Sequence, residues 1–228
     1  MDFKKIWEKV LFGLKWFFHS YIWLFVIFFI IDLVTKLVIV NYFSSHTESI
    51  VLIGTAEKPF LQISYGINER AAFGFGFDSA IANRITYCIV AFLGAGALIT
   101  IYVMNMKKIG PFIKACLMLM LVGALGNLVD RLFYSPSFLH APNNGVVDWI
   151  DFIGIWPFVF NIADSCVVVG TIMLIVYFII DEIKTVKAKR AEEVKETGGK
   201  VLSKEEQKRL EAENKPAEEE KPVEDKAE

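Results

Sequence analysis

Four long apolar stretches divide the sequence, and each is long enough to cross a membrane as a helix. They cover residues 16–42, 82–106, 110–132 and 157–180. A bilayer core is spanned by about 20 mostly apolar residues in a helix, and only a helix or a closed barrel satisfies every backbone polar group in lipid. The pattern therefore predicts an α-helical membrane protein with four transmembrane helices.

A helical pattern also occupies residues 1–15, before the first apolar stretch. Apolar residues recur there every three to four positions, and charged residues lie on the other face. The two faces consist of Phe3, Ile6, Trp7, Val10, Leu11 and Leu14, and of Lys4, Lys5, Glu8, Lys9 and Lys15. This pattern is typical of an amphipathic helix in the membrane interface, with its lysines toward anionic headgroups. A simple basic flank of the first span is the alternative interpretation.

The basic residues predict the orientation of the spans. Four spans place both termini and the connection at residues 107–109 on one side, and most lysines and arginines outside the spans belong to these segments. The opposite loops hold only Lys58 and Arg70 in residues 43–78 and no lysine or arginine in residues 133–156. Because cytoplasmic loops are enriched in Lys and Arg, we expect both termini in the cytoplasm.

The first outer loop has the residue alternation of β-strands. Residues 50–53 and 60–65 form two short runs, which are broken by Gly54 and Pro59. Short runs rich in β-branched and aromatic residues and bounded by Gly or Pro predict strands. We therefore expect a small extracytoplasmic β-sheet between the first and second helices.

Charge is distributed unevenly along the chain. Residues 1–180 hold 12 Lys+Arg and 11 Asp+Glu, whereas residues 181–228 hold 12 and 15. The second segment has few large apolar residues, so we expect a disordered cytoplasmic tail whose removal beyond about residue 192 spares activity. The net charge of −2 and the lack of a basic, aromatic-rich patch argue against nucleic-acid binding. The three cysteines lie in apolar runs and predict neither a disulfide framework nor a metal site.

Ionisable residues within or near the ends of spans are costly and are therefore functional candidates. With the orientation above they gather in the outer part of the membrane: Asp32, Lys36, Asp130, Arg131 and Asp164, with Asp148 and Asp151 in the loop before the fourth span. Asp32 and Lys36 are four residues apart and are predicted to pair on one helix face. Asp130 and Arg131 are interpreted as an ion pair or a headgroup anchor.

Asp148 and Asp164 differ from these because neither has a neighbouring cation in the sequence. Two carboxylates within hydrogen-bond reach cannot both ionise easily, so one keeps its proton at neutral pH. Such a pair supplies a general base and a general acid together, which is the chemistry of aspartic proteases. Structural hydrogen bonding and a proton relay remain alternatives at this point.

Five motifs in order resemble those of the bacterial lipoprotein signal peptidase (signal peptidase II) family. They are DLVTK at 32–36, NERAAFG at 68–74, GALGNLVDR at 123–131, VVD at 146–148 and FNIAD at 160–164. The resemblance implies an intramembrane aspartyl endopeptidase, without metal or cofactor, formed by residues 16–180. Its implied substrates are diacylglyceryl-modified prolipoproteins, cut on the amino side of the lipidated cysteine in the bacterial cytoplasmic (inner) membrane. Membrane lipid as a partner, inhibition by globomycin and a monomeric state are further expectations.

The resemblance also implies residue roles. Asp148 and Asp164 match the catalytic pair of the family. The supporting or substrate-binding residues are Asp32, Lys36, Asn68, Asn127, Asp130, Arg131 and Asn161, and Gly123 and Gly126 allow close helix packing. Three departures concern substrate contacts: Arg70 and Val122 stand where glycine is usual, and residues 132–145 form a longer segment.

Two other classes of function compete with a peptidase. A small proton-coupled transporter would use the same charged residues as a relay. The clustering of these residues in the outer half and the lack of an inverted repeat count against it. A non-enzymatic membrane scaffold would explain the charged tail but not the buried carboxylates.

Overall fold

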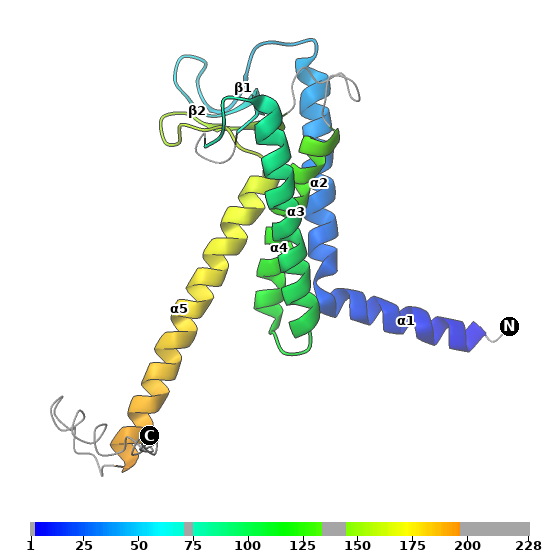
Figure 1. Cartoon of the computed structure of the whole chain (residues 1–228), viewed down its shortest axis with the longest axis vertical. Coiled ribbons are helices and arrows are strands. Elements are labelled where there is room, and N and C mark those ends of the chain that lie inside the picture. Colours follow the sequence, from blue (N-terminus) through cyan, green and yellow to red (C-terminus); the bar gives the residue numbers. More distant parts are fainter. Residues whose placement is uncertain (1–2, 71–74, 134–144, 197–228) are drawn as a thin grey trace, which may run out of the picture. The chain divides into compact units, whose positions relative to one another are not determined.

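The computed structural model describes residues 3–70, 75–133 and 145–196 (Figure 1). The end of the NERAAFG motif, most of the longer segment at 132–145 and the tail beyond residue 196 lie outside the described residues. The chain divides into two compact units, Met1–Val176 and Tyr177–Glu228. All candidate residues belong to the first unit.

Five helices and three strands make up the described chain. They are α1 (Phe3–Ser20), α2 (Ile22–Phe43), β1 (Ile50–Gly54), β2 (Pro59–Asn68), α3 (Ala80–Asn105), α4 (Pro111–Phe133), β3 (Val146–Phe152) and α5 (Ile162–Glu196). Among the described residues, α2, α3, α4 and α5 are long and apolar enough to span a membrane. The prediction of four transmembrane helices is therefore confirmed.

Two predicted span boundaries are wrong. The first span begins at Ile22 rather than at residue 16, because Tyr21 has a left-handed backbone (φ 62°) that ends α1 and redirects the chain. The fourth begins at Ile162 rather than at residue 157, because Phe160 forms a β-bridge with Ile150. Helix α5 also continues past residue 180 to Glu196, so residues 181–196 of the segment expected to be disordered are helical.

Helix α4 is the central helix of the first unit. Half of the residues in its apolar stretch are buried, whereas 11–17% of the corresponding residues are buried in the other three spans. Leu117, Met118 and Leu121 on one side join Ala95 and Tyr102 of α3 in a buried cluster. A second cluster, formed by Leu119, Val122 and Cys166, brings α5 against α4 and α2.

Small residues of α4 bring α5 and α2 close to it. A Cβ on Gly126 would lie 2.6 Å from Asp32 Oδ2 and 3.0 Å from the Ala163 Cβ, and a Cβ on Gly123 would collide with Val167. The predicted role of Gly123 and Gly126 in close helix packing is therefore confirmed. Without these glycines the buried polar groups of the three helices could not meet.

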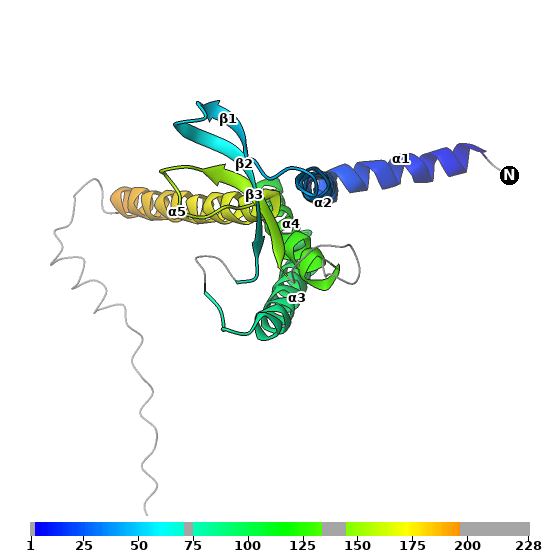
Figure 2. The ribbon, with the colours of Figure 1, turned by 90° about the horizontal axis from the view of Figure 1, so that it is seen from above.

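The predicted β-sheet is present and has a strand that the sequence reading missed. Its order is β1-β2-β3, with both pairs antiparallel (Figure 2). Strand β3 comes from the loop before α5 and pairs Val147 with Ile67 and Asp148 with Gly66. Val147 is fully buried against Ile39 of α2. The sheet therefore fixes the backbone next to Asp148 over one end of the bundle.

Candidate functional site

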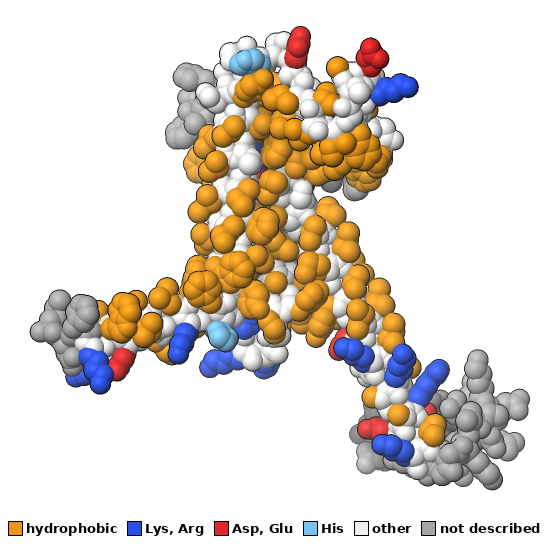
Figure 3. Space-filling view, turned by 180° about the vertical axis from the view of Figure 1, so that it is seen from behind, with side chains coloured by type: hydrophobic (Ala, Val, Ile, Leu, Met, Phe, Trp, Pro, Cys, Tyr) orange, Lys and Arg blue, Asp and Glu red, His pale blue; other side chains and the backbone are white. Residues whose placement is uncertain are grey.

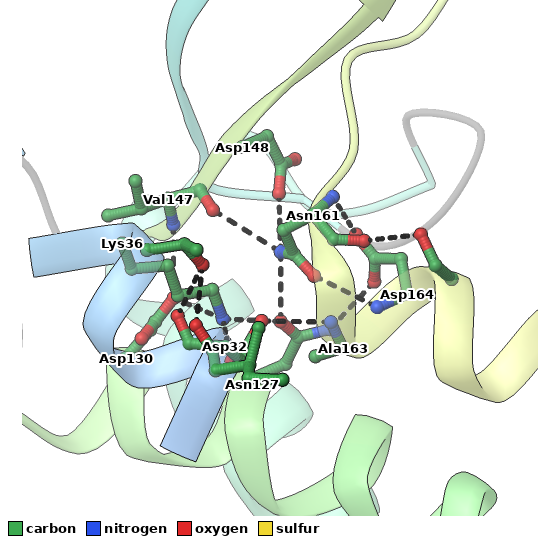
Figure 4. A network of polar contacts seen from close by, with 12 residues as sticks. Asp32, Lys36, Asn127, Asp130, Val147, Asp148, Asn161, Ala163 and Asp164 are labelled. Carbon is green, nitrogen blue, oxygen red and sulfur yellow. Dashed lines mark hydrogen bonds and ion pairs between the residues drawn. The ribbon is translucent and has the colours of Figure 1, made fainter. Parts of the chain in front are cut away.

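Three buried charges form a cluster between α2 and α4 (Figure 4). Lys36 Nζ lies 2.8 Å from Asp32 Oδ2 and 2.9 Å from Asp130 Oδ2, and all three side chains are fully buried. The predicted Asp32–Lys36 pair is confirmed. The interpretation of Asp130 as a partner of Arg131 or a headgroup anchor is wrong, because the neighbouring positions point apart on the helix and Asp130 turns inward to Lys36. We call Asp32, Lys36 and Asp130 the Lys36 cluster.

Each carboxylate of the Lys36 cluster also holds a backbone group next to a candidate aspartate. Asp32 Oδ1 accepts a hydrogen bond from the Ala163 N–H at 2.8 Å, and Asp130 Oδ2 accepts one from the Val147 N–H at 3.1 Å. Ala163 and Val147 directly precede Asp164 and Asp148. The cluster therefore ties both candidate aspartates to the same lysine through their own backbones.

Asp164 lies in the first turn of α5, where Asn161 caps the helix. The Asn161 Oδ1 accepts from the Asp164 N–H at 2.9 Å, and the Asp164 Oδ2 accepts from the Asn161 N–H at 3.3 Å. This reciprocal arrangement is a capping box, here with Asn and Asp. The sequence reading placed Asn161 inside the helix, whereas it lies just before the helix begins.

The Asn161 side chain contacts both candidate aspartates. Its Nδ2 donates to Asp148 Oδ1 at 2.7 Å and lies 3.3 Å from the Val147 carbonyl. Asn161 is fully buried, Asp148 is 3% exposed and Asp164 is half-buried. One amide thus holds Asp148 and Asp164 on either side of itself, as Figure 4 shows.

Asn127 of α4 links this pair to the Lys36 cluster. Its Nδ2 donates to Asp164 Oδ1 at 2.7 Å. Its Oδ1 accepts from Lys36 Nζ at 3.2 Å and from Asn161 Nδ2 at 3.1 Å. Seven of the nine residues singled out from the sequence therefore belong to one connected network.

The other two candidates are attached to the edge of this network, Asn68 through Asp148 and Arg131 through the Asn127 carbonyl. Asn68 ends β2, and its side chain accepts from the Arg70 N–H at 3.0 Å. Arg131 donates to the Asn127 and Arg70 carbonyls at 3.4 and 3.2 Å, and its guanidinium lies 5.3 Å from the centre of the Tyr87 ring. Arg131 therefore connects α4 to the segment that follows β2.

Other residues raised by the sequence have structural partners. Asp151 accepts a hydrogen bond from Gln62 at 2.8 Å on the sheet. Arg70 lies 3.8 Å from Asp78 in an exposed pair, and Val122 is buried in the core.

The sequence reading missed a group at the start of α3. The buried Asn83 side chain makes two hydrogen bonds with the Phe77 backbone, and Arg84 donates to the Arg131 and Leu132 carbonyls. The two polar side chains at the start of an otherwise apolar helix are the sequence feature that could have predicted this group.

Burial raises the pKa of Asp148 to about 7, and the negative charge of Asp164 adds to this shift. Hydrogen bonds from Asn68 and Asn161, and the charge of Lys36, act in the opposite direction. A carboxyl group with a pKa near 7 is about half protonated at neutral pH. Asp148 can therefore give or accept a proton where an ordinary aspartate is ionised.

The raised pKa of Asp148 predicts a pH-dependent stability. Between about pH 4 and pH 7 the folded protein keeps the Asp148 proton and the unfolded chain releases it, so stability falls as pH rises through this window. We expect Asp148→Asn, which cannot ionise, to raise the thermal unfolding temperature at pH 8 by several degrees. The gain should shrink toward pH 4. Tryptophan fluorescence during heating in detergent measures the unfolding temperature of both proteins. Equal unfolding temperatures of the wild type and Asp148→Asn at pH 8 would contradict the prediction that burying the ionised Asp148 is costly.

Among the described residues, no group of three or more His, Cys, Asp or Glu side chains is arranged to hold a metal ion. The two candidate carboxyl groups have side-chain amide and backbone donors around them. Such an arrangement can move protons to and from a water molecule and a polar substrate group.

Comparison with known proteins gives a consistent result. A family model described as "Signal peptidase (SPase) II" matches residues 24–180. A lipoprotein signal peptidase of Fusobacterium nucleatum is 33% identical over 156 residues, which cover 68% of this chain and 84% of that protein. One from Clostridioides difficile is 37% identical over 123 residues, covering 54% of this chain and 73% of that protein. A solved structure described as a bacterial membrane enzyme is 28% identical with a TM-score of 0.55, covering 69% of this chain and 86% of that one.

Proposed function

Because the chain belongs to the signal peptidase II family, we propose that it removes signal peptides from diacylglyceryl-modified prolipoproteins as an intramembrane aspartic endopeptidase. The observation that carries this proposal is that one buried residue, Asn161, donates to both carboxylates, from its side-chain Nδ2 to Asp148 and from its backbone N–H to Asp164. In this proposal these two carboxylates form the catalytic pair. The Lys36 cluster, Asn68, Asn127, Arg131 and Asn161 position the pair or the substrate.

The surroundings of the two carboxylates suggest different resting states. Asp164 accepts hydrogen bonds from Asn127 and from the Asn161 backbone and lies at the N-terminus of α5, where the helix dipole favours negative charge. Asp148 lies on β3 rather than at a helix N-terminus, and is therefore the better site for a proton. We therefore assign Asp164 as the general base and Asp148 as the general acid.

The proposed reaction follows from these states. Ionised Asp164 takes a proton from a water molecule, whose oxygen attacks the carbonyl carbon of the residue before the lipidated cysteine. Asp148 gives its proton to the carbonyl oxygen, which prevents a buried oxyanion from forming. When the tetrahedral intermediate collapses, Asp164 gives its proton to the leaving nitrogen, and Asp148 recovers one from the hydroxyl group. Both carboxyl groups then return to their starting states.

The proposed location follows from the charge distribution. Lysines and arginines at the two ends of the chain and in the α3–α4 turn favour cytoplasmic termini in the bacterial inner membrane. The catalytic pair then lies toward the extracytoplasmic face, where a substrate can enter from lipid with its acyl chains in the bilayer. A monomer suffices for this chemistry, because one chain supplies both carboxylates. Globomycin is the proposed inhibitor.

Lipid dependence is the test of this function. We expect the purified protein to cut a prolipoprotein that bears diacylglyceryl on its cysteine, and to cut the same polypeptide without the lipid at least about tenfold more slowly, because acyl chains hold the substrate at the site. Gel shift and mass spectrometry of the products measure the rates and the cleaved bond. Equal rates would remove the lipid-recognition part, and a new N-terminus other than the lipidated cysteine would remove the assigned position.

A further inference from the structure

Helix α1 precedes the family-matched residues 24–180 and leaves both of its faces exposed. Its apolar residues Trp7, Val10 and Leu14 are 56%, 45% and 48% exposed. We propose that α1 binds anionic phospholipid headgroups at the membrane surface and so fixes the depth of α2 in the bilayer.

The bend between α1 and α2 is held by contacts from α3 and α4, one of them buried. Tyr21 takes a left-handed backbone, which is uncommon for a residue other than glycine. Ser20 beside it is 2% exposed, and its carbonyl accepts a hydrogen bond from the Tyr102 hydroxyl of α3. Lys114 of α4 lies 3.5 Å from the His19 carbonyl. Contacts from α3 and α4 therefore set the direction in which α1 leaves α2.

This direction places α1 along the membrane surface. Figure 1 shows α1 running crosswise from the end of α2, so when α2 spans the bilayer, α1 lies in the interface. Figure 3 shows orange side chains along the upper side of α1 and blue ones on the side turned away from the spanning helices. An interfacial helix needs this division, with apolar side chains toward the acyl chains and lysines toward the headgroups.

Charge identifies the partner. Helix α1 carries four lysines and one glutamate, and Lys107, Lys108 and Lys114 lie at the same end of the bundle. Basic residues at a bilayer surface attract anionic lipids within a Debye length. Two copies of the chain that met through the lysine side of α1 would instead bring like charges together. The surface therefore fits phosphate headgroups with a net negative charge.

Helix α2 connects α1 to the candidate site. Asp32 lies ten residues after Ile22, which is about 15 Å along a helix. Holding α1 at the surface therefore fixes how deep Asp32 and Lys36 lie. Helix α1 thus acts as a stop that prevents α2 from sliding along the bilayer normal.

Quenching of Trp7 by brominated lipid tests this proposal in the full-length protein. Nanodiscs would contain dibromo-phosphatidylcholine with or without 30% phosphatidylglycerol, and the Trp7 signal is the difference between the wild type and Trp7→Phe. We expect at least twofold stronger quenching with phosphatidylglycerol, and loss of this increment in the variant Lys4→Gln/Lys5→Gln/Lys9→Gln/Lys15→Gln. The control Lys184→Gln/Lys187→Gln/Lys189→Gln/Arg190→Gln removes four charges elsewhere and should keep the increment.

Three results would overturn the proposal. Equal quenching with and without phosphatidylglycerol would show a purely apolar insertion. An increment that survives the four α1 substitutions would show that these lysines are not the binding groups. An increment that appears only with two protein copies per nanodisc would identify a second copy as the partner. Because the readout is fluorescence, none of these outcomes depends on peptidase activity.

Discussion

Replacing either Asp148 or Asp164 by asparagine is expected to reduce cleavage of a diacylglyceryl-modified prolipoprotein by about 10³-fold or more. Both carboxyl groups contact the Asn161 residue, and each would handle a different proton in the same step. Groups that act as one unit are not additive, so the double variant should be no slower than either single variant. A gel-shift assay with single-turnover amounts of substrate measures these rates.

Asp151→Asn is the matched control for this experiment. Asp151 belongs to the same strand as Asp148, but its carboxylate is hydrogen-bonded to Gln62 on the sheet. It should keep activity within about threefold of the wild type, since the substitution removes a carboxylate without touching the Asn161 contacts. Near wild-type cleavage by both Asp148→Asn and Asp164→Asn would refute the assigned pair.

The second large effect is expected at Lys36. Lys36→Met leaves the two carboxylates of the Lys36 cluster fully buried without their cation, and breaking a buried ion pair in this way costs about 3–5 kcal/mol. We expect a marked fall in the thermal unfolding temperature and loss of activity in the protein that remains folded. Tryptophan fluorescence during heating, followed by the cleavage assay, separates the two effects.

A triple variant distinguishes charge from shape at this position. Asp32→Asn/Lys36→Met/Asp130→Asn removes the buried charges together, while the asparagine oxygens can still accept from the Ala163 and Val147 N–H groups. Its unfolding temperature should recover toward that of the wild type. If Lys36→Met alone unfolds at the wild-type temperature, the cluster does not hold the bundle together.

The local parts of this site could be predicted from the sequence. The four-residue spacing of Asp32 and Lys36 predicts their contact, because residues four apart share a helix face. The three-residue spacing of Asn161 and Asp164 is also typical of a helix cap. The prediction that the helix begins at residue 157 placed both residues inside the helix and so obscured this cap. The four spans and the first two strands were predicted because each depends on residues close in sequence.

The remaining parts depend on residues far apart in sequence. Asp130 contacts Lys36 only when α4 packs on α2. Nothing in the sequence near Asp130 favours Lys36 as its partner over the adjacent Arg131. Strand β3 is short and forms because β2, from an earlier loop, offers it a free edge. The left-handed backbone of Tyr21 is likewise stabilised by contacts from another helix, which the sequence around Tyr21 does not predict.

The spacing of Asp32 and Lys36 also bears on how the protein is made. Helix α2 is synthesised and enters the membrane before Asp130 exists, so its charges must cross into lipid without their later partner. Because the two side chains can neutralise each other on one helix face, α2 can insert without a net charge in its core. Asp130 arrives later, and its docking converts a pair that served insertion into the three-charge centre of the finished bundle.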